Sequence, residues 1–340
     1  MTRLPARISF VAVLALWLFA PHPARAATLT LYSRLSFAPA VTQAFTTKTG
    51  IKIRLRRPPA SGLQSRIIAE GDHPVWSLAW FDGAATATIL DHHGLLAHHL
   101  PNPPDLTPLG QSLTSADGAY VPTGVTLAGV LVAPKAAPFA PPGTWDALND
   151  PAYHGIIGMN DPATSEQSFA TLANMLHAAG GWTAGQPYVE ALKRNGLHIY
   201  TETKITLAAL RSGAIQLAIV RSAAAFHYAT DIDPSLRVII PQPTAIMPSV
   251  IVMAKGLTGT RRADAEKFIA YVNTATALKI GMTQGGIDAD FWPVTTSTPP
   301  PAALPSLTSL SPHVLDPAQW GTSRHAIIAW YATEIVGPST

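Results

Sequence analysis

The 340-residue chain contains no cysteine, which excludes disulfides and thiolate metal sites. It also lacks the local motifs of common catalytic sites: no Gly-x-Ser-x-Gly elbow, no phosphate-binding P-loop and no His-Glu-x-x-His pair occur in it. A hydrolase would need a nucleophile beside an oriented base, and no local spacing supports one. We therefore expect a protein that is not an enzyme and uses no cofactor; a secreted hydrolase is the weakest alternative.

Charged residues are scarce, at 13% of the chain, whereas hydrophobic residues make up 47%. This balance is typical of a compact globular protein. The chain has 23 Lys+Arg and 20 Asp+Glu, and three of its cations (Arg3, Arg7 and Arg25) lie in a segment that we expect to be removed, which leaves 20 against 20. A neutral mature protein has no electrostatic reason to bind nucleic acid or acidic membranes.

Long apolar runs are absent except near the start, where Ile8 to Ala20 forms one that is too short to span a bilayer. A basic start precedes this run, and the small-x-small exit Ala24-Arg25-Ala26 follows it. These features predict a secretory signal peptide over residues 1–26, cleaved after Ala26, with a mature start at Ala27. Without a cysteine to carry a lipid, the product should be soluble and exported to a bacterial periplasm.

The remaining residues, about 310, are enough for two domains. Strand patterns at 28–33, 51–56 and 75–81 alternate with helical patterns at 37–49, 63–70 and 84–93. This β-α-β-α-β-α order is typical of a doubly wound α/β sheet.

A hydroxyl-rich turn, Asp161 to Ser168, lies midway along the chain between an apolar strand pattern at 155–159 and a helical pattern that begins at Phe169. Thr164 or Ser165 is a suitable N-cap for this helix. A helix N-terminus at the carboxyl end of a strand offers free N–H groups and partial positive charge, which favour an anionic or strongly polar ligand. Most capped helices bind nothing, so the prediction of a site depends on the rest of the chain.

The spacing of Trp145, Leu148, Pro151–Ile156 and Asp161–Pro162 resembles a stretch shared by periplasmic solute-binding proteins of ABC importers. The resemblance is to the branch that binds ferric iron, phosphonates or sugar phosphates. Further matching segments follow in the same order over nearly the whole mature chain: Leu29–Ser33, Phe45–Ile53, Gly94–Leu96, Leu210–Ala218, Lys267–Tyr271 and Trp292–Pro293.

This resemblance implies two doubly wound α/β lobes joined by two crossing hinge strands near Val121 and Ile239, with the ligand in the cleft between them. Lobe one would comprise residues 27–122 and 245–340, and lobe two residues 123–242. The implied function is that of the periplasmic substrate-binding component of an ABC transporter, a monomer that docks on an inner-membrane permease. A ligand-sensing partner of a membrane receptor is the alternative.

The resemblance also suggests which ligand to expect. Iron-binding members hold the ion with a tyrosine pair, a carboxylate and sometimes a histidine. The tyrosine positions, after the strand pattern at 214–220, are Ala223 and Ala224 here, and the histidine position is Ser36. Only the carboxylate survives, as Asp82. Direct binding of ferric iron is therefore disfavoured, and an iron chelate is the remaining iron alternative.

Basic and hydroxyl side chains occupy the cleft turns instead, and arginine suits carboxylate or phosphate groups. We expect an anionic or zwitterionic solute such as a phosphonate, phosphate ester or carboxylate. Arg221 could also be a salt-bridged strand-end residue, and Glu166 could either favour its helix N-terminus or join Asp82 in binding an amine. The predicted ligand-binding residues are Ser33, Arg34, Ser36, Asp82, Thr123, Gly124, Thr164, Ser165, Glu166, Ser168, Thr203, Lys204 and Arg221.

Four histidines near residue 95 are a possible metal site, since neutral imidazoles bind zinc or copper. His92 and His93 precede a Gly-Leu-Leu bend, and His98 and His99 follow it. Such a bend at a helix end is usually exposed, so we interpret them as ordinary surface histidines and predict no metal ligands.

Overall fold

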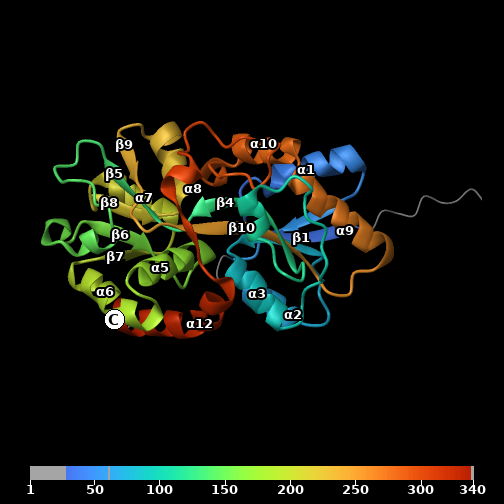
Figure 1. Ribbon diagram of the computed structural model, residues 1–340, viewed down its shortest axis with the longest axis horizontal. Coiled ribbons are helices and arrows are strands. Elements are labelled where there is room, and N and C mark those ends of the chain that lie inside the picture. Colours follow the sequence, from blue (N-terminus) through green and yellow to red (C-terminus); the bar gives the residue numbers. More distant parts are fainter. Residues whose placement is uncertain (1–27, 60–61, 338–340) are drawn as a thin grey trace, which may run out of the picture.

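The computed structural model describes residues 28–59 and 62–337; the predicted signal peptide over residues 1–26 and the mature start at Ala27 lie outside these described residues. Two β-sheets stand side by side, each with its own helices (Figure 1). We call the first sheet with its helices the first lobe and the second sheet with its helices the second lobe. Within the described ranges, no helix is long and apolar enough to cross a membrane.

The first sheet has the strand order β11-β10-β3-β1-β2, with β4 paired to the other edge of β10. β1 is parallel to β2 and β3, and β10 is antiparallel to β3 and β4. Buried aromatic side chains pack together behind the sheet: Trp80 of β3 meets Phe37, which precedes α1, and Phe268 of α9 edge-on. The strands are β1 (Leu29–Ser33), β2 (Ile53–Arg56), β3 (Leu78–Asp82), β4 (Tyr120–Leu127), β10 (Ala245–Met253) and β11 (His313–Val314). The helices of the first lobe are α1 (Ala38–Thr49), α2 (Leu63–Glu70), α3 (Ala84–His92), α4 (Pro108–Ser112), α9 (Gly259–Val272) and α10 (Ala275–Gln284).

The second sheet has the order β7-β6-β8-β5-β9. Its central strand β8 is parallel to β6 and antiparallel to β5, and is buried throughout. The strands are β5 (Val130–Pro134), β6 (Ile157–Asn160), β7 (His198–Tyr200), β8 (Leu217–Val220) and β9 (Leu236–Ile239). The helices are α5 (Glu166–Ala178), α6 (Trp182–Arg194), α7 (Thr203–Ser212) and α8 (Ser222–His227), with short 3-10 turns η2 (Asp146–Asn149) and η3 (Pro151–Tyr153) and a π-helical turn η4 (Tyr228–Ile232).

The chain crosses between the sheets at Ala128–Gly129 and again at Ile240–Thr244. The two crossings are joined, because the N–H of Ala128 donates to the carbonyl of Ala245 at 2.8 Å. Gly129 has a φ of 89°, and a Cβ there would lie 2.7 Å from Cγ2 of Thr171, so glycine alone fits. The first crossing lies later than the predicted hinge at Val121, because β4 stays paired with β10 as far as Leu127 and so continues past the predicted boundary at 122/123.

The end of the chain bridges the two lobes. Helix α12 (Pro317–Trp330) continues into the π-helical turn η6 (Tyr331–Val336) and runs beneath both lobes from α3 towards α6 (Figure 1). Gly321 sits against the backbone of Ala85 in α3. Further along, Ile327 and Tyr331 are buried in a cluster with Phe169 of α5. The remaining short helices are η5 (Gly286–Asp288) and α11 (Leu307–Leu310).

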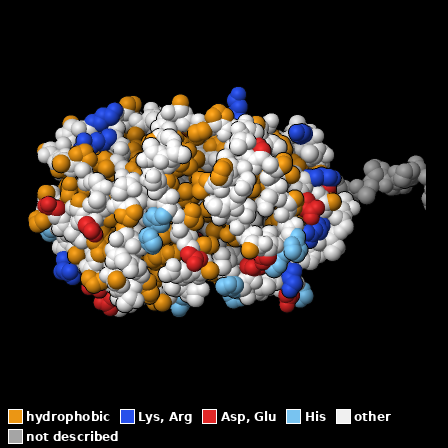
Figure 2. Space-filling view, in the orientation of Figure 1, with side chains coloured by type: hydrophobic (Ala, Val, Ile, Leu, Met, Phe, Trp, Pro, Cys, Tyr) orange, Lys and Arg blue, Asp and Glu red, His pale blue; other side chains and the backbone are white. Residues whose placement is uncertain are grey.

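Basic and acidic side chains are interspersed on the face of the molecule shown in Figure 2. This mixture fits the equal numbers of cations and anions that the sequence predicts for the mature chain. A ligand that depends on charge must therefore find it at a particular site, because the broad surface field is weak.

Candidate functional site

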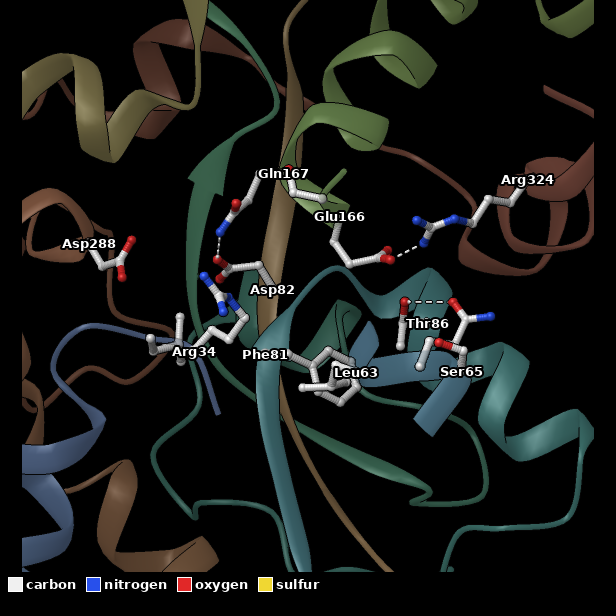
Figure 3. A pocket seen from close by; sticks show the side chains of 13 residues that line it. Arg34, Leu63, Ser65, Phe81, Asp82, Thr86, Glu166, Gln167, Asp288 and Arg324 are labelled. Atoms are coloured by element: carbon white, nitrogen blue, oxygen red, sulfur yellow. Dashed lines mark hydrogen bonds and ion pairs between the residues drawn. The ribbon is translucent and has the colours of Figure 1, made fainter. Parts of the chain in front are cut away.

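Two adjoining cavities lie between the lobes, at the carboxyl ends of β3, β6 and β8, with volumes of about 250 Å³ and 540 Å³. Open α/β sheets bind ligands beyond these strand ends. Figure 3 shows the smaller cavity, where side chains from α5, α12 and the end of β3 face one another. Four residues line both cavities: Arg34, Ser165, Gln167 and Asp288.

Arg221, just after β8, is buried between the lobes and 7% exposed. Its Nη1 donates to Oδ2 of Asp82 at 2.8 Å, and its Nη2 pairs with Asp288 and donates to the carbonyl of Ile287 at 3.3 Å. Burial alone would lower the pKa of Arg221, but Asp288 and Asp82 outweigh it and raise the pKa. Arg221 therefore forms the salt bridges that the sequence offered as an alternative, with two carboxylates of the first lobe. It also lines the larger cavity, so a part in binding solute stays a prediction.

Both carboxylates have further donors. Nε2 of Gln167 donates to Asp82 at 2.7 Å, and the Ser249 hydroxyl donates to the other Asp82 oxygen. Ser36 donates to Asp288 from its hydroxyl at 2.6 Å and from its N–H at 2.7 Å. Burial would raise the pKa of Asp288, but Arg221 and the Ser36 hydrogen bonds outweigh it and lower the pKa. Asp82 thus joins the lobes through Gln167 and Arg221, whereas Ser36 positions Asp288 within the first lobe.

Glu166, the first residue of α5, pairs with Arg324 of α12 across the smaller cavity (Figure 3). The guanidinium also lies over the Phe169 ring, 4.9 Å from its centroid. Burial lowers the pKa of Arg324 to about 10, so the group stays charged at neutral pH. Glu166 is neutralised by this partner, which removes the repulsion of an anion that its position would otherwise cause. Sequence reasoning missed Arg324, because the pair spans 158 positions and leaves no local signal.

The N-terminus of α5 opens onto both cavities. Ser165 is the N-cap: its Oγ accepts from the N–H of Ser168 at 3.2 Å and lies 2.9 Å from the Ser168 hydroxyl. The backbone N–H groups of Glu166 and Gln167 donate to no partner in the described part of the chain. They are therefore available to a ligand. Ser165, one of the two N-caps that the sequence predicted, is confirmed as the cap of α5, and the polar turn from Asp161 leads into it.

A second helix N-terminus faces the larger cavity. There the N–H groups of Thr203 and Lys204, which begin α7, donate to no described residue. The Thr203 hydroxyl accepts from Nδ2 of Asn160 at 2.7 Å, and Lys204 forms an exposed ion pair with Glu202 at 2.9 Å. Thr164 also lines this cavity, while its hydroxyl donates to the carbonyl of Asp161 at 2.7 Å. Asn160 is a further cavity residue that the sequence did not single out.

Arg34 is exposed and faces both cavities from the turn after β1. Its Nη1 donates to the carbonyl of Pro58 at 2.9 Å, and it forms no ion pair with a carboxylate of the described residues. Of the arginines predicted for the cleft, Arg34 therefore retains an uncompensated charge, whereas Arg221 does not.

Three predicted residues form the wall behind the cavities. Ser33 is fully buried, and its Oγ accepts from the N–H of Leu35 at 3.3 Å. Thr123 accepts from Nε1 of Trp80 at 2.9 Å and donates to the carbonyl of Ser249 at 3.2 Å. A Cβ on Gly124 would lie 2.8 Å from Phe291. Thr123 and Gly124 line a small cavity together with Arg221, so their contact with solute stays a prediction. Ser33 lines none of the three cavities.

The four histidines near residue 95 do not come together. Nε2 of His98 lies 2.6 Å from Asp91, and its Nδ1 lies 3.6 Å from Asp117. His92 and His93, at the end of α3, do not belong to this cluster.

Residues 40–310 match the family of bacterial extracellular solute-binding proteins. The chain belongs to this family. Because its members bind solutes, the expectation of a binding protein, not an enzyme, is confirmed. Comparison with curated proteins finds no significant match.

Solved structures of periplasmic binding proteins share the fold. The AfuA protein of Actinobacillus pleuropneumoniae, with fructose-6-phosphate bound, superposes with a TM-score of 0.78 at 18% identity, over 91% of this chain and 98% of that one. Iron-bound HitA of Pseudomonas aeruginosa gives 0.73 at 21% identity, over 89% and 98%. A periplasmic thiamin-binding protein gives 0.72 at 16% identity, over 91% and 96%. These likenesses confirm the predicted two-lobed α/β fold.

Proposed function

We propose that the chain is the periplasmic substrate-binding component of an ABC transporter and that it captures a small anionic or zwitterionic solute, such as a phosphate ester, phosphonate or carboxylate. The observation that carries this proposal is the pair of helix N-termini at one cavity of about 540 Å³. Free N–H groups and the positive ends of two helix dipoles converge there. The solute would then be delivered to an inner-membrane permease.

The charges around the cleft favour an anion. Asp82 and Asp288 share Arg221, and Glu166 has Arg324, so all three carboxylates at the smaller cavity are ion-paired. These two cations leave one net negative charge, which Arg34 at the same cavity offsets. Arg34 has no carboxylate partner among the described residues, and an anion would supply one. The hydroxyls of Ser165 and Ser168 add uncharged polar groups at the larger cavity.

Ferric iron is the alternative ligand to consider, because the structure of HitA, which shares the fold, contains bound iron. The side chains around the two cavities argue against direct binding, because no tyrosine or histidine is among the described residues that line them. A hard cation would also have to compete with Arg221 for both carboxylates. An anionic iron chelate fits the anion proposal as well as a sugar phosphate does. A thiamin-like cation fits less well, because the acidic groups are already paired.

A thermal-shift screen tests the proposal. Purified protein would be heated with sugar phosphates, phosphonates, carboxylates, thiamin, ferric citrate and ferric ion in turn. A ligand at 100 times its dissociation constant stabilises by about 2.7 kcal/mol, enough for a clear rise in Tm. We expect an anionic compound to produce this rise and Arg34→Ala to reduce its affinity at least tenfold.

Arg54→Ala is the matched control, because Arg54 is an exposed arginine that lines neither cavity. The Arg54→Ala variant should bind the same compound with the affinity of the unaltered protein. Stabilisation by ferric ion or thiamin alone would contradict the anion proposal, and equal losses in both variants would assign the effect to overall charge.

A further inference from the structure

A separate polar cluster lies at the far end of α8 from Arg221. His227 ends α8, Asp231 follows in η4, and Asp290 comes from the segment after η5. One ligand atom from each residue lies within 4.8 Å of the other two. Nδ1 of His227 is 2.9 Å from Oδ2 of Asp231. The cluster thus joins two residues of the second lobe to a segment that follows α10 in the first.

Asp290 is the unusual member. It is 8% exposed, yet its carboxylate accepts no hydrogen bond and forms no ion pair with any residue in the described part of the chain. Burial raises its pKa, Asp231 raises it further, and His227 acts in the opposite direction. Neither Asp290 oxygen is among the completely enclosed polar atoms that lack a partner, so the carboxylate can still reach water or a metal ion. Carboxylates this deeply placed in natural proteins are commonly paired or coordinate a metal.

The other carboxylate–histidine cluster lacks this property. In the group formed by Asp91, His98 and Asp117, the histidine is exposed and contacts both carboxylates. Both carboxylates of this group already contact His98, so the group has no unpartnered carboxylate that a cation would stabilise. The buried and unpartnered Asp290 is what distinguishes the cluster at α8.

We propose that His227, Asp231 and Asp290 bind a divalent transition-metal ion with zinc-like chemistry. One imidazole nitrogen and two carboxylate oxygens form a donor set that suits such an ion, with water completing the coordination. Ligands at about 2.0–2.2 Å from a shared ion are at most about 4.4 Å apart. The three atoms already lie within 4.8 Å of one another, and the Asp231 side chain, 60% exposed, is free of close packing. The ion would bridge the lobes beside the Arg221–Asp288 contact, whichever solute the cleft takes.

Titration of the untagged, metal-stripped protein with Zn²⁺, followed by isothermal calorimetry, tests this site. We expect one ion per chain in the unaltered protein. Asp290→Asn and His227→Gln should each weaken binding at least about tenfold, since even residues behind metal ligands cost 10–100-fold when changed. His98→Gln is the matched control and should leave the affinity unchanged, because it removes the histidine of the other cluster.

Circular dichroism of each variant would verify that it is folded before titration. Absence of Zn²⁺ binding by the unaltered protein would overturn the proposal, as would unchanged affinity in both Asp290→Asn and His227→Gln. Loss of Zn²⁺ binding in His98→Gln would show that the ion binds at Asp91, His98 and Asp117 instead, and would also overturn the proposal. Binding of Ca²⁺ or Mg²⁺ in preference to Zn²⁺ would contradict the transition-metal assignment.

Discussion

At the scale of single residues, Arg221 shows how burial changes the role of a cation. A guanidinium at the end of a strand facing a cleft has the chemistry to bind an anionic ligand. Here it is 7% exposed and contacts Asp82 and Asp288 from the other lobe. A charge removed from water needs such partners, and two carboxylates with their own serine and glutamine donors satisfy it. Arg221 therefore holds the lobes together.

Replacing Arg221 with alanine should lower the free energy of unfolding by about 3–5 kcal/mol, because two buried carboxylates lose their cation. Urea denaturation measures this change. Arg211→Ala is the control: that arginine forms an exposed ion pair with Asp233 at 3.8 Å, and its loss should cost less than about 1 kcal/mol. If Arg221→Ala were as stable as the control and lost anion affinity instead, Arg221 would be a ligand group.

At the scale of elements, α5 connects capping with binding. Ser165 satisfies one N–H of the first turn, and the N–H groups of Glu166 and Gln167 stay available towards the cavities. The same helix packs Phe169 and Leu172 into the cluster shared with α12. The apolar face anchors the helix, and this anchoring holds its N-terminus at the cleft.

Ser165→Ala should destabilise the protein by about 1 kcal/mol through the lost cap, and should also weaken solute binding. Asp316→Ala provides the comparison, because Asp316 caps α12 by accepting from Ala318 and Gln319 and lines neither cleft cavity. We expect a similar loss of stability from it with no change in affinity. Urea denaturation and calorimetry with the solute found in the screen measure the two effects, and equal affinities in both variants would remove Ser165 from the site.

At the scale of the whole molecule, the contacts that join the lobes include three with charged or titratable groups. They are the Arg221 ion pairs, the Glu166–Arg324 pair, and the stacking of His177 on His313 at 4.4 Å. If the lobes separate to admit a solute, as we propose, the Arg221 pairs must break, and a ligand that restores equivalent interactions would favour closure. The C-terminal helix α12, which carries Arg324, contacts both lobes.

Acid should weaken the His177–His313 contact. Burial lowers the pKa of His313, and the neighbouring His177 lowers it further. In the unfolded chain His313 takes up a proton near pH 6.5, whereas in the folded chain it does so only at lower pH. The stability that neutral His313 contributes is therefore fully present above pH 6.5. It is lost as the pH falls through the folded-state pKa of His313. Urea denaturation at pH 7.5 and 5.5 should show a smaller loss in His313→Gln than in the unaltered protein. His154→Gln, at an exposed histidine, should keep the full loss; an unchanged pH dependence in His313→Gln would contradict this role.

Much of the fold was predictable because its signals are local. Helices over 37–49, 63–70 and 84–93 were placed within one residue of α1, α2 and α3, since apolar spacing and terminal glycines mark their limits. The first crossing was placed too early, because the continued pairing of β4 with β10 depends on a partner more than 100 residues away. Ser33 and Thr123 were assigned to the cleft because they lie at turns that the family resemblance directs towards it, whereas their burial is a property of the assembled lobes.

The sequence alone determined the α/β class, the family resemblance, the absence of catalytic motifs and the capped turn at Ser165, because each rests on neighbouring residues or on composition. Only the tertiary structure decided which charges remain available. Arg221 and Glu166 are neutralised by residues 139 and 158 positions distant, while Arg34 is not. Electrostatic pairing depends on distance and burial in space, so residue types along the chain cannot reveal it.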